Sequence, residues 1–142
     1  MRLTFSVPGK PQGKGRPRAS RDGHMYTPKQ TREYEALIRR CYQLMHKDKK
    51  LTGYVSLDII AVYPIPRGTK KQDRELMIAG KLLPDKKPDG DNIEKAVADA
   101  LNGVAYDDDK QIVSAHWRKI YSGDSIHMGL VVTVSDEDLA ET

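Results

Sequence analysis

The chain has very little of several residue types and patterns that define whole classes of protein. Its single cysteine, Cys41, excludes a disulfide within the chain and a cysteine-rich zinc site. No apolar run approaches the roughly 20 residues that a membrane-spanning helix needs, and no signal peptide is visible. The four histidines show no metal-ligand spacing. We therefore expect a cytoplasmic protein with no membrane partner and no covalent cysteine catalysis.

A glycine-rich run near the N-terminus lacks the features of a nucleotide-binding loop. Residues 9–14 superficially resemble a P-loop, but only three residues separate Gly9 from Gly13. Gly15 also stands where a serine or threonine should follow the lysine. We expect no nucleotide cofactor.

The length and charge of the chain limit the number of domains and the kinds of partner it can have. At 142 residues the chain fits one domain with a substantial core. The net charge of +4 understates its basic character, because four of the last eight residues are acids and the rest of the chain carries +8. We expect one domain over residues 1–134 and an acidic tail over residues 135–142. A basic body of this size suits a nucleic acid, although scattered lysines more often only solvate a surface.

Two segments concentrate the positive charge. Residues 8–26 combine basic side chains with glycines and prolines, which predicts a flexible loop that closes over a phosphate backbone. Residues 67–87 hold seven basic residues against three acids. An ordinary solvated loop is the alternative interpretation of either segment. The residues predicted to contact nucleic acid are Lys10, Lys14, Arg16, Arg18, Arg21, Lys86 and Lys87.

The most informative stretch covers residues 87–112, where two acidic clusters flank a short amphipathic helix. The first cluster is Asp89 and Asp91, and the second is residues 107–109. Carboxylates gathered in this way repel one another unless a divalent cation compensates them, and oxygen-only ligands favour Mg²⁺ or Mn²⁺. Because the second cluster enters an apolar strand, the two clusters can converge on one site. The pattern predicts metal-assisted phosphoryl transfer.

The helix between the clusters is predicted over residues 91–102, with Asp91 as its N-cap and Glu94 completing a capping box. Lys95 follows Asp91 by one turn on the same face, so a metal and a lysine would face one phosphate. Asp99, one turn further along, is expected to hold Lys95 in place. Each feature taken alone also has an interpretation without function. Asp91 would only cap the helix, Lys95 would be a solvated side chain, and the second cluster would be an acidic turn.

Hydrophobic periodicity predicts the scaffold. Strands are expected at residues 3–7, 54–62, 111–121 and 125–134, with the last two joined in a hairpin through residues 122–124. A helix should start after Pro28, and a short helix should cover residues 71–79. The expected fold is α+β, a four-stranded mixed sheet with two to three helices packed against it, in the order β-α-β-α-β-β. Apolar positions expected along the first helix are Tyr34, Leu37, Ile38, Cys41, Tyr42 and Met45.

Three spaced motifs and an N-terminal run carry a family resemblance. The motifs are Pro88-Asp89-x-Asp91-Asn92-x-x-Lys95, residues 99–103, and an Asp-Asp-x-Gln-Ile that ends at Ile112. Together they resemble the RusA family of Holliday junction resolvases, and the run from Gly9 to Pro28 is similar to its phage and prophage branch. The resemblance implies a homodimeric, Mg²⁺-dependent endonuclease that makes paired nicks across a four-way DNA junction, in DNA recombination and repair.

The resemblance also implies roles for individual residues. By position, Asp89 and Asp91 match two metal ligands of the family, and Lys95 matches its essential lysine. The third ligand matches Asp109. Because three successive aspartates stand here where the family commonly has two, Asp108 is the second choice for that ligand.

Two other functions and a dimer interface complete the expectations. A non-catalytic DNA-structure-binding protein and a less specific metal-dependent nuclease are the alternatives to a junction resolvase. A junction has two equivalent strands to cut and each chain has one acidic site, so a twofold-symmetric homodimer matches the substrate. Candidate interface residues are Ile60, Trp117 and Val131, any of which can instead belong to the core.

Overall fold

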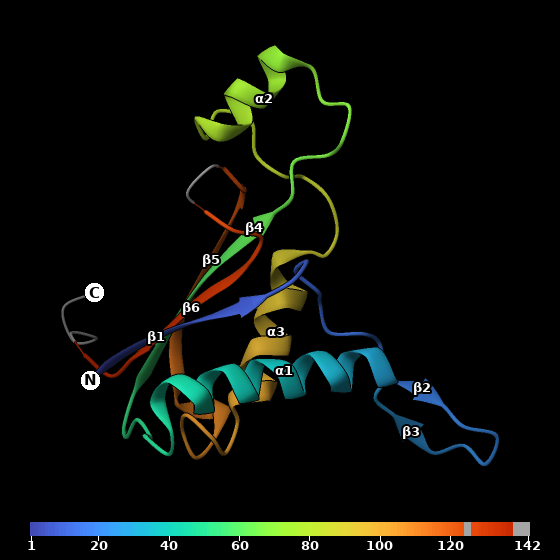
Figure 1. Ribbon diagram of the computed structural model, residues 1–142. Coiled ribbons are helices and arrows are strands. Elements are labelled where there is room, and N and C mark those ends of the chain that lie inside the picture. The colour runs from blue at the N-terminus through green and yellow to red at the C-terminus, as the bar shows by residue number, and fades with distance from the viewer. Residues whose placement is uncertain (124–125, 138–142) are drawn as a thin grey trace.

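A mixed four-stranded sheet forms the centre of the protein (Figure 1). The computed structural model describes residues 1–123 and 126–137. In spatial order, the strands are β1 (Arg2–Pro8), β6 (Gly129–Ser135), β4 (Val55–Tyr63) and β5 (Ile112–Tyr121). β6 is antiparallel to both β1 and β4, whereas β5 is parallel to β4. The predicted α+β class and the mixed sheet are confirmed.

Alternation of apolar and polar residues gives this sheet one apolar face. In β1, Leu3, Phe5 and Val7 are buried and the residues between them are exposed. Every second residue of β4, from Val55 to Tyr63, is buried in the same core. Because successive side chains of a strand point to opposite faces, the opposite face of the sheet carries the more polar set.

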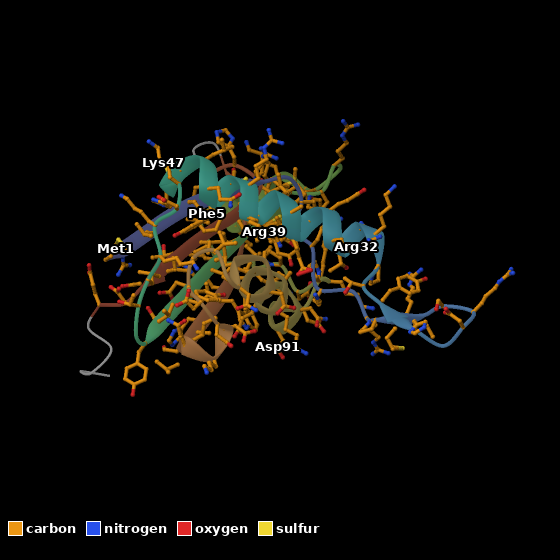
Figure 2. All side chains as sticks on the ribbon, turned by 90° about the horizontal axis from the view of Figure 1, so that it is seen from below. Met1, Phe5, Arg32, Arg39, Lys47 and Asp91 are labelled. Carbon is orange, nitrogen blue, oxygen red and sulfur yellow. The ribbon has the colours of Figure 1, made fainter. Side chains whose placement is uncertain are left out.

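Helices α1 (Lys29–His46) and α3 (Gly90–Leu101) contribute their apolar stripes to the core that covers this face. The two helices contact each other, and Arg39 Nε in α1 donates a 3.2 Å hydrogen bond to the Ala100 carbonyl oxygen in α3. Figure 2 shows Asp91 at the surface, on the side of α3 away from α1. Helix α2 (Lys71–Ile78) buries none of its side chains and lies beyond the end of the sheet (Figure 1). The start of α3 therefore stays accessible.

The predicted helices and strands occur near their expected positions, with two local differences. Met45 is 63% exposed, so the apolar stripe of α1 ends before it. The basic segment is not a loop throughout, because Arg18–Ala19 (β2) pairs with Met25–Tyr26 (β3). These strands form a narrow hairpin that projects from the end of α1 where the helix begins (Figure 1).

The predicted hairpin between the last two strands is wrong. β4 lies between β5 and β6, and β6 pairs with β1 and β4 instead. The physical reason is the composition of the strands: β6 carries no charged residue and takes a central position, whereas β5 carries His116, Arg118 and Lys119 and takes an edge. Asp124, predicted to lie in the connection, is outside the described residues, as is the end of the predicted acidic tail at residues 138–142.

Within the described residues, no helix has both the length and the apolar character needed to cross a membrane.

Candidate functional site

The first acidic cluster lies at the start of α3. Asp89 is the N-cap residue and Asp91 lies in the first turn, so the prediction that Asp91 caps the helix is wrong by two positions. The helix starts earlier because the Asp89 carbonyl oxygen accepts hydrogen bonds from Asn92 N and Ile93 N, both at 3.1 Å. The Asp89 side chain makes no capping hydrogen bond within the described structure. Both carboxylates are exposed at the start of the helix, which is the positive end of its dipole.

Gly90, between these two aspartates, is packed against the ring of Trp117 in β5. A Cβ atom at residue 90 would lie 2.2 Å from Trp117 Cδ2 and Cε2, so a larger residue would require the helix start or the ring to move. Trp117 is paired with Ile59, on the face of the sheet that carries α3. Ile60 and Val131 are paired on the opposite face, so the Trp117 side chain lies on the other face from these two, although all three residues line the same hollow at this edge of the sheet.

The segment before Asp89 is held by strands β4 and β5. Tyr63 Oη donates a 3.0 Å hydrogen bond to the Pro88 carbonyl oxygen, and Lys119 Nζ donates one of 2.8 Å to the Lys86 carbonyl oxygen. The Lys119 ammonium also lies 5.6 Å from the centre of the Tyr63 ring. Burial, and then the negative charge of Asp89, raise the pKa of Tyr63. Tyr63 and Lys119 therefore position the backbone that carries Asp89.

The N-terminal basic segment packs against the other side of the site. Lys14 N donates a 2.8 Å hydrogen bond to the Asn92 carbonyl oxygen in α3. A Cβ atom at Gly13 would lie 2.9 Å from the Cβ atoms of Pro88 and Asn92, so the absence of a side chain allows this close approach. Gly15 N donates a 3.0 Å hydrogen bond to Thr31 Oγ1 in α1. These contacts fix the segment between α1 and α3.

The Lys14 side chain is paired within the chain. Its ammonium lies 3.0 Å from Asp99 and 3.1 Å from Glu35. Burial alone would lower the pKa of Lys14, but the hydrogen bonds to Asp99 and Glu35 outweigh it and raise the pKa. The prediction that Asp99 holds Lys95 is wrong, because Lys14 reaches Asp99 from the N-terminal segment. The Lys95 side chain is exposed on α3.

A cleft of about 730 Å³ joins the acidic helix start to the basic segment. Asp89 and Asn92 line one side of it. Most of the residues that the sequence predicted to contact nucleic acid line the rest, whereas Arg21 lies in the β2–β3 connection and Lys86 lies outside the cleft. The predicted contact residues in the cleft are Lys10, Lys14, Arg16, Arg18 and Lys87.

The second acidic cluster begins a short 3₁₀ helix, η1 (Asp109–Gln111). Asp108 caps it, since its carboxylate accepts a 2.9 Å hydrogen bond from Lys110 N, and that backbone hydrogen bond lowers the pKa of Asp108. Partial desolvation, followed by the hydrogen bond and charge of Asp108 and by the charge of Asp99, raises the pKa of Asp109. The two neighbouring acids therefore differ: the Asp108 carboxylate binds a backbone N–H, and Asp109 lies near the negative charges of Asp108 and Asp99.

The structure places the two clusters at opposite ends of α3. Asp89 and Asp91 lie at its start, beside Tyr63 at the end of β4, whereas Gln111 Nε2 in η1 donates a 3.0 Å hydrogen bond to the Gly53 carbonyl oxygen before β4 begins. A helix of 12 residues is about 18 Å long. Accordingly, residues 1–123 and 126–137 contain no group of three or more acidic, histidine or cysteine side chains that could hold a metal ion. One chain brings together Asp89 and Asp91, and it does not bring Asp108 or Asp109 to them.

Sequence reasoning missed three residues around the helix start: Tyr63, Lys119 and Trp117. They come from β4 and β5, and their proximity to Asp89 depends on the parallel pairing of those strands. The alternation in β5 put Trp117 and Lys119 on the same face, which was the available signal. The pairing partner of β5 was not predictable from that alternation.

Comparison with known proteins shows what the chain is similar to. Residues 8–135 match the family model described as Endodeoxyribonuclease RusA. A protein of Bacillus subtilis (strain 168), named Uncharacterized protein YqaN, is 36% identical over 125 residues, which cover 84% of this chain and 88% of that protein.

Proposed function

Because the chain belongs to the RusA endodeoxyribonuclease family, we propose that it is a Mg²⁺-dependent endonuclease that resolves four-way DNA junctions by paired nicks, in recombination and repair. Membership of the family identifies the chain as a nuclease that acts on DNA. The observation that best supports the finer proposal is the cleft in which Asp89, a candidate metal ligand, lies beside Lys10, Arg16 and Arg18. A candidate metal ligand and basic side chains that can bind phosphates thus line one cleft.

The residues at the start of α3 fit Mg²⁺. This ion keeps several water molecules and is usually held by one or two carboxylates together with substrate phosphates, and Asp89 and Asp91 supply two exposed carboxylates. Mn²⁺ prefers the same oxygen donors. When bound, such a cation polarises the scissile phosphate and lowers the pKa of a coordinated water.

Lys95 follows Asp91 by one helical turn, and its ammonium can offset negative charge that develops on the phosphate oxygens. An electrostatic contact of this kind contributes about 3 kcal/mol to the transition state. Tyr63 and Lys119 would act on the same site indirectly, through the Pro88 and Lys86 carbonyl oxygens that they bind.

The phosphate backbone on either side of the cut would lie along the cleft. Lys10, Arg16, Arg18 and Lys87 offer their charges there. Lys14 lines the same cleft but its charge is offset by Glu35 and Asp99, so we assign it a mainly structural role.

Paired nicking requires two sites, and we propose a twofold-symmetric homodimer. The polar face of the sheet is a candidate interface, because Ile60 and Val131 line a shallow hollow of about 340 Å³ on it together with charged residues of neighbouring strands. Asp109 remains the proposed third metal ligand on the family resemblance. Since α3 separates Asp109 from Asp89 and Asp91 within one chain, the dimer offers the simplest source: Asp109 of the partner subunit would complete the site.

The experiment that tests this function is incubation of the purified protein with a labelled four-way junction and with a linear duplex, each with and without Mg²⁺. We expect cleavage of the junction with Mg²⁺ and none in excess chelator. Binding to the junction without cleavage would indicate a non-catalytic DNA-structure-binding protein. Equal cleavage of junction and duplex would indicate a less specific nuclease.

Asp91→Asn should abolish cleavage and leave junction binding at or above its original level, because it removes a ligand and one negative charge that faces DNA. Asp48→Asn is the matched control, since it makes the same change at an exposed residue in the segment after α1. A normal cleavage rate for Asp91→Asn would show that this carboxylate is not a metal ligand.

A further inference from the structure

Trp117 is the single tryptophan of the chain, and it is 42% exposed on the edge strand β5. Part of its apolar ring therefore stays open to solvent. Its immediate neighbour across the fold is Gly90, the residue between Asp89 and Asp91.

The orientation of the Trp117 ring follows from which of its atoms lie closest to Gly90. A Cβ atom on Gly90 would lie 2.2 Å from Cδ2 and Cε2, the two atoms shared by the rings of the indole, and 2.4 Å from Cε3. The backbone of Gly90 therefore lies over the middle of the indole and covers one face of it. The exposed fraction of the side chain must come from the opposite face and the edges.

A flat aromatic surface fixed on one face and open on the other is a stacking platform. Proteins that hold unpaired nucleic acid place aromatic side chains in this way, because every base has a π-face that can stack on them. We propose that Trp117 stacks on a nucleobase next to the scissile phosphate and so contributes to the recognition of branched DNA. The proposal rests on the proposed function, because it needs the phosphate to bind at Asp89 and Asp91.

The position of Trp117 determines which DNA structures can place a base on its ring. The ring touches the backbone between the two candidate metal ligands, so a base that reaches it belongs to a nucleotide at or beside the cut. In an uninterrupted duplex, both faces of each base are covered by neighbouring base pairs. At the exchange point of an open four-way junction, bases lose a stacking neighbour on one side, and an indole can replace it. Trp117 would thus favour a junction over a duplex.

Because the chain has one tryptophan, the intrinsic fluorescence of the unmodified protein reports on this ring alone. The titration is made in chelator, with a four-way junction and a duplex of the same sequence, while anisotropy of a dye on the DNA measures binding separately. We expect acrylamide to quench the tryptophan fluorescence of the free protein readily. Junction binding should quench the emission and shield the ring from acrylamide, whereas bound duplex should leave both properties nearly unchanged.

Three variants separate stacking from a purely structural role. Trp117→Leu keeps apolar bulk over Gly90 but removes the flat ring, and it should weaken junction binding by about 5- to 150-fold while duplex binding changes little. Trp117→Phe keeps a smaller ring and should lose less. Tyr54→Leu removes another exposed aromatic side chain, at the other end of the sheet, and should leave the junction preference unchanged. Thermal melting of each variant measures any loss of support for the start of α3.

The outcomes for stacking and for the proposed function are distinct. Junction binding and cleavage with no change in tryptophan emission, or an unchanged junction preference in a folded Trp117→Leu variant, would overturn stacking and leave the nuclease proposal intact. Quenching by the junction without any Mg²⁺-dependent cleavage would support stacking and contradict the nuclease proposal. A protein that binds neither DNA would refute both.

Discussion

A mixture of two inactive variants should regain activity if the metal site is shared between subunits. The variants are Asp91→Asn, at the start of α3, and Asp109→Asn, beyond its end. About 15 Å of helix lies between Asp91 and the end of α3, beyond which Asp109 lies. That length exceeds by several-fold the roughly 4 Å that can separate two ligand atoms of one Mg²⁺, each about 2.1 Å from the ion.

The size of the effect follows from the twofold symmetry. Equimolar mixing with free subunit exchange gives about half heterodimers. If each site takes Asp91 from one chain and Asp109 from the partner subunit, one site of the heterodimer carries both changes and the other carries neither. The mixture should then nick at about one quarter of the wild-type rate, because half of the dimers each have one intact site of two. If one chain supplied all ligands, both sites of the heterodimer would be damaged.

The assay is nicking of a labelled four-way junction with Mg²⁺, before and after the variants are mixed and incubated to exchange subunits. The matched control is Asp91→Asn mixed with Lys95→Ala, because both changes lie on the same helix and no site escapes them. A mixture of Asp91→Asn and Asp109→Asn no more active than the separate variants would refute the shared site. If Asp108→Asn is inactive alone and its mixture with Asp91→Asn regains nicking, Asp108 and not Asp109 is the third ligand.

Three further predictions concern the surroundings of the site. Replacing Arg16 and Arg18 by alanine should lower the slope of log affinity against log salt by about 1.8, at about 0.9 for each lost phosphate contact, and an unchanged slope would make the segment an ordinary solvated one. Lys14→Met should leave that slope nearly unaltered but lower the melting temperature, because its ammonium is paired with two carboxylates; a loss of slope equal to that of one arginine would contradict this. Gly90→Ala should destabilise the protein by about 1 to 3 kcal/mol through overlap with Trp117, and an unchanged melting temperature would show that the ring moves freely.

Much of the fold was predictable because it depends on local patterns. Alternation in β1 and β4 and the helical stripe of α3 each bury one face, whatever their partners are. The strand order was not predictable, because a turn signal at residues 122–124 says only that two strands follow each other closely. The choice between pairing β5 with β6 and inserting β4 depends on contacts across the whole sheet.

The candidate site also contains residues that the sequence could group and contacts that it could not predict. Asp89, Asp91 and Lys95 lie within two helical turns, so their spacing in the sequence was enough to group them. Asp109 was grouped with them by a family pattern along the chain, and the helix between places it elsewhere in the same subunit. The pairing of Lys14 with Glu35 and Asp99 joins three distant segments, and no spacing in the sequence signals it. The sequence was thus enough to predict the residues that lie close together along the helix, but not the contacts that distant segments make with them.

Metal-dependent junction resolution can be measured directly by the cleavage of a supercoiled plasmid that extrudes one cruciform. With Mg²⁺, the wild-type protein should convert this plasmid to linear DNA with cuts at the cruciform, because a dimer nicks two opposed strands within one binding event. In chelator, or with Asp91→Asn, the plasmid should stay supercoiled although the protein remains bound. Cuts spread over the whole plasmid, or linear product formed equally in chelator, would contradict a metal-dependent junction resolvase.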